Sequence, residues 1–210
     1  MTTDQPDRLA QLDAVRRSVD SRTRDGAATK VVTVAQDYPV GVGELWQAVT
    51  TAERISRWLM PVSGDLRLGG RYQLEGNAGG QVLECEQAQR LAVTWEFAGE
   101  VSWVVATLTG DDESSTLRVE HEAPVDQERW DQYGPGAVGI GWDSMFLGLA
   151  LHLASGGSSR EGAEEWVASS EGRAFMSRSG AAWLGAQVAA GEDEQSARAA
   201  AERCLAAYLG

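Results

Sequence analysis

Basic residues are scarce in this chain, and lysine is almost missing. The 210 residues include 18 basic and 31 acidic side chains, which give a formal net charge of −13, and Lys30 is the single lysine. A chain this acidic repels phosphate backbones and anionic lipid headgroups. We therefore expect neither a nucleic acid nor a membrane as its partner.

Cysteine and histidine are equally rare, which limits the chemistry that the chain can carry. Cys85, Cys204, His121 and His152 are scattered, with none of the short spacings typical of a metal site or a disulfide framework. The segment GVGELW (41–46) lacks the third glycine of a dinucleotide fingerprint, and no phosphate-binding loop or GxSxG nucleophile motif occurs. We expect no metal, no cofactor and no catalytic nucleophile.

An apolar leader is missing from the N-terminus, which begins with the acidic segment MTTDQPDRLAQLD. Secretory signals need a continuous apolar stretch after a basic start. Together with the two distant cysteines, this pattern predicts a reduced, cytoplasmic protein.

One long apolar run is present, GAVGIGWDSMFLGLALHLA (136–154). Asp143 near its middle and four glycines argue against a membrane span, and neither end has an aromatic belt or basic flank. We predict a core helix over residues 136–152 that is buried on most of its sides. One face, which would pack on a sheet, carries Trp142, Met145, Phe146, Leu149 and Leu153.

The remaining apolar positions of this helix, including Ile140 and Leu151, need a second cover. We expect it from residues 160–210, whose pattern is helical and follows the break at Gly156-Gly157. At the other end of the chain, Leu9, Leu12, Val15 and Val19 recur at helical spacing, which predicts a short helix there.

Between these ends, the pattern alternates as β-strands do. Residues 31–38 (VVTVAQDY) predict a strand, residues 44–59 two short helices, and residues 64–121 a series of strands joined by tight turns. Such short connections allow only antiparallel pairing. The predicted organisation is an N-terminal helical arm (1–29), an α+β domain (30–155) and a C-terminal helical extension (156–210).

Two segments in this order resemble a known family. They are RWLMPVSGDLRLGGRYQLEG (57–76), with Trp58, Pro61 and the glycine pair before Tyr72, and GQVLECEQAQRLAVTWEF (80–97), with Arg90-Leu91 before Trp95. The sequence resembles the START-related SRPBCC helix-grip superfamily, and within it bacterial proteins similar to the C-terminal domain of the activator of the heat-shock protein 90 ATPase. The resemblance covers roughly residues 30–154. Leu59 stands where that family often has phenylalanine.

The resemblance implies a curved antiparallel sheet wrapped around the long helix, often with an apolar cavity between them. It does not fix a function, because the superfamily includes lipid carriers, hormone receptors, cyclases and chaperone regulators. For this chain it implies ligand binding or, through the chaperone activator, a part in the stress response.

Aromatic residues supply the candidate site. Strand periodicity places Trp95 with Leu91, Val93 and Phe97 on one face, and His121 with Leu117 and Val119. The expected ligand-binding residues, drawn from four elements, are Tyr72, Trp95, His121, Trp142, Asp143 and Phe146. Trp103 is predicted to point outward, and His152 to be structural.

Three functions are compatible with this pattern. We favour a binding module that holds a small hydrophobic molecule between the sheet and the long helix. The alternatives are a co-chaperone-like regulator of a heat-shock protein 90 type ATPase, which would bind a protein partner, and a cyclase- or hydratase-type enzyme. The enzyme reading depends on an acid–base pair of His121 and Asp143. The competing interpretation of the aromatic set is an ordinary packed core.

Overall fold

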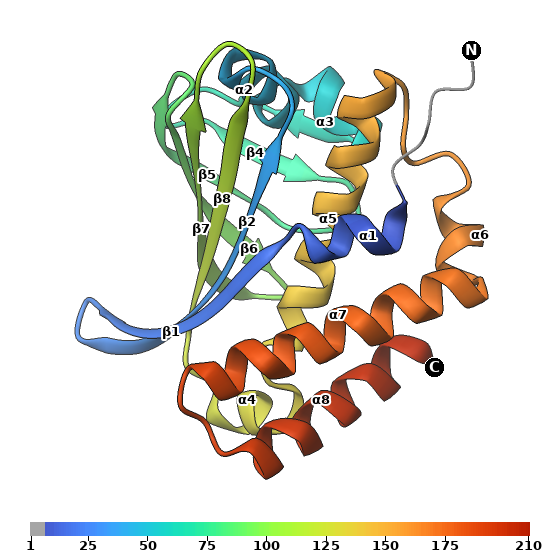
Figure 1. Cartoon of the computed structure of the whole chain (residues 1–210). Helices are drawn as coiled ribbons and strands as arrows, with labels where there is room; N and C mark the ends of the chain where they lie inside the picture. The colour runs from blue at the N-terminus through green and yellow to red at the C-terminus, as the bar shows by residue number, and fades with distance from the viewer. Residues whose placement is uncertain (1–6) are drawn as a thin grey trace.

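A single antiparallel sheet curls around one long helix. The computed structural model describes residues 7–210, and it has the strand order β1-β2-β8-β7-β6-β5-β4-β3 with every neighbouring pair antiparallel. Figure 1 shows the helix α5 (Gly136–Ser155) lying in the hollow of this sheet. The predicted α+β helix-grip fold is confirmed. The strands are β1 (Arg16–Arg24), β2 (Ala27–Tyr38), β3 (Val62–Gly64), β4 (Arg71–Leu74), β5 (Gly79–Glu86), β6 (Arg90–Phe97), β7 (Glu100–Gly110) and β8 (Ser115–Pro124).

Helices cover the ends and the open side of the sheet. The two short helices expected between the first strand and the meander close one end of the grip, next to α5, and the C-terminal helices lie along the other end (Figure 1). The helices besides α5 are α1 (Arg8–Asp13), α2 (Val42–Thr50), α3 (Ala52–Trp58), α4 (Gln127–Tyr133), α6 (Ala163–Ala168), α7 (Ser170–Ala189) and α8 (Glu194–Leu209).

The helix α5 is enclosed on nearly all sides. By length and composition it could cross a membrane, but only Val138, Ala154 and Ser155 of its residues are exposed, because the sheet packs on one side and α1 and α7 on the other. Its apolar surface is therefore satisfied within the protein, as expected for the core helix of a grip fold. The helix extends three residues beyond the predicted end, and Gly156 terminates it in the left-handed conformation.

The N-terminal helical arm predicted over residues 1–29 is wrong beyond Asp13. Residues 16–24 form the edge strand β1, which pairs along its whole length with β2 through a turn at Asp25-Gly26. Both turn residues have positive φ, which matches the two-residue hairpins that follow the twist of the strands. Val15 and Val19 are buried as expected, but from an extended chain. Residues 1–6 of the predicted arm lie outside the described residues.

The C-terminal extension supplies the second cover that α5 requires. Helix α7 packs against α5 and β1, and α8 packs on α7 and α4. Trp183 of α7 is 1% exposed and lies directly against Gly139, where a Cβ atom would come within 2.2 Å of the indole ring. Gly139, one of the four glycines of this helix, thus allows close helix–helix contact.

We predict that Gly139→Ala destabilises the protein by about 2 kcal/mol in urea unfolding. The added methyl group must displace a fully buried indole, and this overpacking outweighs the gain of about 1 kcal/mol that alanine brings to a helix. Gly141→Ala is the matched control, because its Cβ would meet nothing nearer than the Tyr208 hydroxyl at 3.9 Å. Equal stability of the two variants would contradict this account.

Candidate ligand-binding site

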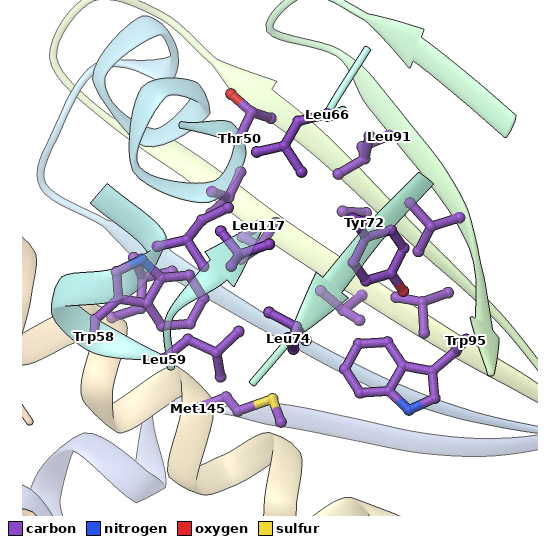
Figure 2. A pocket seen from close by; sticks show the side chains of 18 of the residues that line it. Thr50, Trp58, Leu59, Leu66, Tyr72, Leu74, Leu91, Trp95, Leu117 and Met145 are labelled. Atoms are coloured by element: carbon purple, nitrogen blue, oxygen red, sulfur yellow. The ribbon is translucent and has the colours of Figure 1, made fainter. Parts of the chain in front are cut away.

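An apolar cavity of about 150 Å³ lies between the concave face of the sheet and α5. Figure 2 shows its side chains converging from the sheet, the short helices and α5. The only lining residues whose side chains carry a hydroxyl, thiol or indole N–H are Thr50, Cys85, Tyr72 and three tryptophans. The lining comprises Val49, Thr50, Ile55, Trp58, Leu59, Val62, Leu66, Tyr72, Leu74, Val82, Cys85, Leu91, Val93, Trp95, Val104, Ala106, Leu117, Val119, Trp142, Met145, Phe146 and Leu149.

Strand alternation explains most of the lining. Every second residue of a strand faces the same side of a sheet, so Leu91, Val93 and Trp95 of β6 enter the cavity together. On β5 the register shifts between Val82 and Glu84. This β-bulge brings both Val82 and Cys85 to the cavity although three positions separate them.

Three aromatic rings form a compact cluster at one end of the cavity. The ring centroids of Trp95 and Trp142 are 5.7 Å apart, and that of His121 lies 5.8 Å from Trp95 and 5.9 Å from Trp142. The rings are tilted or edge-to-face, the arrangements that aromatic quadrupoles favour. Residues from β6, β8 and α5 therefore close this end of the cavity with one shared wall, as the strand and helix periodicities predicted.

Hydrogen bonds fix the tautomer of His121. The indole N–H of Trp142 donates to Nδ1 at 3.1 Å, so the ring proton sits on Nε2 and donates to the Ser102 hydroxyl at 2.8 Å. The hydroxyl in turn donates to the carbonyl of Trp95 at 3.1 Å. Burial lowers the pKa of His121 from 6.5 to about 4. The imidazole is therefore neutral at physiological pH and held in one orientation.

Four of the six predicted site residues line this cavity, namely Tyr72, Trp95, Trp142 and Phe146. The hydroxyl of Tyr72 donates to the carbonyl of Thr94 at 2.8 Å, and burial raises its pKa. His121 belongs to the aromatic wall but opens onto a neighbouring hollow. The sixth residue, Asp143, lies elsewhere.

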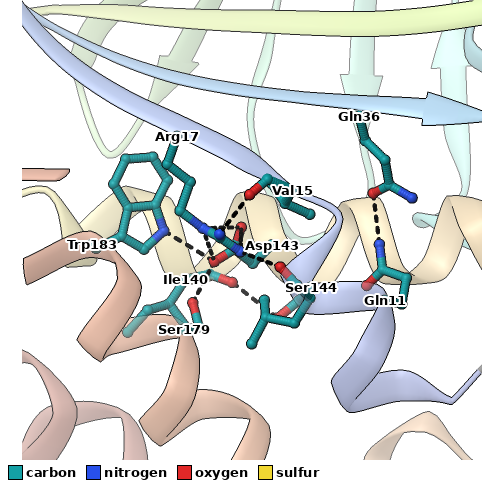
Figure 3. Close-up of polar contacts among 10 residues, drawn as sticks. Gln11, Val15, Arg17, Gln36, Ile140, Asp143, Ser144, Ser179 and Trp183 are labelled. Atoms are coloured by element: carbon teal, nitrogen blue, oxygen red, sulfur yellow. Dashed lines mark hydrogen bonds and ion pairs between the residues drawn. The ribbon is translucent and has the colours of Figure 1, made fainter. Parts of the chain in front are cut away.

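Asp143 does not approach His121, so the acid–base pair on which the enzyme alternative depends does not form. Its carboxylate accepts hydrogen bonds from Arg17 Nε of β1 at 3.0 and 3.1 Å and, from α7, those of Ser179 Oγ at 2.5 Å and Trp183 Nε1 at 3.1 Å (Figure 3). The physical reason is helical geometry, since Asp143 is rotated by about 100° from its neighbour Trp142. A position that faces the tail cannot also face the grip.

The Arg17–Asp143 pair is buried, with side-chain exposures of 8% and 0%. Arg17 also donates to the carbonyls of Val15 at 2.8 Å and Leu12 at 3.1 Å. Burial raises the pKa of Asp143, while Arg17 and the hydrogen bonds of Ser179 and Trp183 act in the opposite direction. This single carboxylate ties together α5, the start of β1 and α7.

We predict that Arg17→Ala destabilises the protein by about 3–5 kcal/mol, because it leaves a buried carboxylate without its counterion. Arg16→Ala is the matched control. Arg16 is the preceding residue and also pairs with an aspartate, Asp37, but both of those side chains are more than half exposed. Exposed pairs contribute no more than about 1 kcal/mol. Similar losses for the two variants, measured by urea unfolding, would overturn the assigned role of Asp143.

The neutral state of His121 predicts a pH dependence. Its folded pKa of about 4 lies below the unfolded value of 6.5, so the unfolded chain binds the proton first as the pH falls. The contribution of His121 to the free energy of unfolding is fully present above pH 6.5. It falls by roughly 3 kcal/mol as the pH drops to 4. His121→Gln should lose correspondingly less stability between pH 7 and pH 4 in urea titrations. Parallel pH profiles for the two proteins would refute the assignment.

Two further expectations hold. His152 is fully buried and structural: Arg54 Nε donates to its Nε2 at 2.9 Å, and its Nδ1 contacts the carbonyl of Gly157 at 2.6 Å. Trp103 lies outside the grip and stacks with the guanidinium of Arg24 at 4.3 Å from the ring centroid. Across residues 7–210, His, Cys, Asp and Glu side chains form no group of three that could hold a metal ion.

Sequence reasoning missed the cavity wall that comes from α2, α3 and the loop after them. Trp58, Leu59 and Leu66 all line the cavity, and the indole N–H of Trp58 is anchored to the carbonyl of Ala48 at 3.0 Å. The segment 57–76 carries the family resemblance and could have indicated this wall, but Tyr72 is the one residue of it among the predicted site residues.

Comparison with known proteins agrees with this architecture. The family model described as "Activator of Hsp90 ATPase homolog 1-like protein" matches residues 39–154. The chain belongs to this family. Its predicted place in the START-related SRPBCC helix-grip superfamily is thereby confirmed. No relative was found among the curated proteins.

Solved structures extend the similarity beyond the family model. CalU16 from Micromonospora echinospora is 30% identical; its solution structure covers 90% of this chain and 100% of that chain, with a TM-score of 0.68. Its crystal structure covers 82% and 98%, with a TM-score of 0.65. Since the family model ends at residue 154, the CalU16 match must include much of the C-terminal extension. DynU16, a protein in the dynemicin biosynthetic locus, is 28% identical over 61% of this chain and 49% of that chain, with a TM-score of 0.54.

Proposed function

We propose that this protein binds a small, uncharged, apolar molecule in the cavity between the sheet and α5. The observation that carries the proposal is the cavity itself, about 150 Å³ of space with an almost entirely apolar lining. A packed core leaves few voids larger than a water molecule. A cavity of this size lined by Leu, Ile and Phe side chains stays dry and accepts benzene. The cavity is therefore large enough for one ring of that size.

The polar groups around the cavity favour an uncharged ligand. Tyr72, Trp142 and His121 already direct their polar atoms to protein partners. A charged ligand would lose its hydration without gaining a counterion there. Shape and apolar contact must then supply most of the affinity.

The alternative functions receive less support. The enzyme alternative needs His121 beside Asp143, but His121 bonds to Trp142 and Ser102 whereas Asp143 bonds to Arg17, Ser179 and Trp183. The regulator of a heat-shock protein 90 type ATPase is favoured by the family description alone. The similarity to DynU16, a protein in the dynemicin biosynthetic locus, supports a small molecule as the partner. A cytoplasmic location remains part of the proposal.

The test measures the binding of fluorobenzene through the broadening of its ¹⁹F resonance. We expect saturable binding to the wild-type protein and at least tenfold weaker binding to Met145→Trp, because the larger side chain fills the cavity. Met145 is partly buried on α5 and lines the cavity (Figure 2).

Leu153→Trp is the matched control. Leu153 lies on the same helix, is also partly buried, and does not line the cavity. Its variant should bind fluorobenzene like the wild type. Binding that never saturates, or that Met145→Trp leaves unchanged, would leave only the packed-core interpretation.

A further inference from the structure

A second hollow of about 440 Å³ adjoins the cavity at the other side of the aromatic wall. We call it the vestibule. Trp95 lines both spaces, and the vestibule also touches Phe97, Val101, Ser102, His121 and Val138. Two hollows that share a wall are candidates for one continuous site.

The same secondary-structure faces run through both spaces. On β6, Leu91 and Val93 line the cavity, Trp95 stands at the divide, and Phe97 lines the vestibule. On β8, Leu117 and Val119 precede His121 and Ala123 in the same way. Because alternate residues share one face of a sheet, the cavity and the vestibule are successive stretches of a single channel along α5.

Trp95 is the least constrained part of the wall. The indole N–H of its neighbour Trp142 donates to His121 at 3.1 Å. Within residues 7–210 the indole N–H of Trp95 makes no hydrogen bond to the protein, and it is open to solvent because the side chain is only partly buried. Rotation of Trp95 would therefore break no hydrogen bond of that group, whereas Trp142 is held in place.

The rim of the vestibule is unusually apolar for a protein surface. Phe97, Val101 and Val138 are 53%, 46% and 37% exposed, and they are three of the seven large hydrophobic side chains exposed in the described chain. Exposed apolar groups gathered around a hollow mark a binding site more often than isolated ones do.

The charges of the vestibule are already compensated. Lys30 pairs with Glu192 at 3.0 Å, and Arg129 pairs with Glu100 at 2.7 Å. The Asp126 carboxylate accepts the backbone N–H of Arg129 at the start of α4. No free cation or anion is left among these groups to select a ligand of opposite charge.

We propose that the cavity and the vestibule together bind one elongated, uncharged molecule with two ring systems, with Trp95 as the movable partition between them. One ring occupies the cavity, and the other lies in the vestibule beside His121 and Ser102. This inference rests on the proposed function and adds the length and class of the ligand.

The test compares a short probe with a long one. Fluorobenzene fits the cavity alone, whereas 1,6-diphenylhexatriene carries two rings on a linear chain and fluoresces in an apolar environment. We expect Met145→Trp, which fills the cavity, to lower the affinity for both probes at least tenfold. Val101→Trp, which fills the vestibule, should lower only the affinity for diphenylhexatriene by that factor.

Val167→Trp is the matched control, because Val167 is as exposed as Val101, at 46%, and lines neither space. Val138→Trp repeats the vestibule block from α5. The two-ring site is overturned if both vestibule variants, or Met145→Trp, bind diphenylhexatriene as tightly as the wild type does. It is also overturned if Val167→Trp loses as much affinity for this probe as the vestibule variants do. In any of these cases, fluorobenzene that binds wild type and not Met145→Trp leaves the proposed function intact. Failure of fluorobenzene itself removes the proposed function, and this inference with it.

Discussion

The long helix α5 has no polar face, and the rest of the molecule is arranged to satisfy that constraint. A helix that is apolar all round must be covered on every side. The curled sheet covers the side of Trp142 and Phe146, and α7 covers the side of Ile140 and Gly139. The C-terminal extension is therefore part of the core. The buried carboxylate of Asp143 then fixes where the two covers meet, because it must find Arg17, Ser179 and Trp183 together.

Most of the fold could be predicted from the sequence, because local patterns and tertiary needs agree along residues 30–155. The N-terminal segment was the exception. The spacing of Leu9, Leu12, Val15 and Val19 suits a helix, and β1 buries only Val19, so this strand has no alternating apolar pattern that could indicate it. The pair Asp25-Gly26 was the signal that could have decided the question, because this dipeptide favours a two-residue hairpin.

The site was predictable where periodicity acts and not where partners from distant segments act. Tyr72, Trp95, Trp142 and Phe146 follow from strand and helix faces alone. The prediction for Asp143 was wrong because its partner Arg17 lies in β1, within the segment that was predicted to be a helical arm. Helix geometry did contain a warning, since residue 143 shares its side with 139 and 147 and is rotated by about 100° from residue 142. The division of the grip into a cavity and a vestibule depends on ring orientations, which no sequence pattern specifies.

The polar groups near the grip bear on what it can recognise. In catalytic sites, titratable groups are commonly left with perturbed pKa values and open access to a substrate. Here both nitrogens of the neutral His121 imidazole are hydrogen-bonded, one to Trp142 and the other to Ser102. Ser102 in turn donates to the backbone carbonyl of Trp95. These hydrogen bonds hold Trp142 and His121 in place, whereas within residues 7–210 the indole N–H of Trp95 has no protein partner. Rotation of Trp95 therefore breaks no hydrogen bond between that group and the protein, and the site that we propose would select its ligand by length and shape.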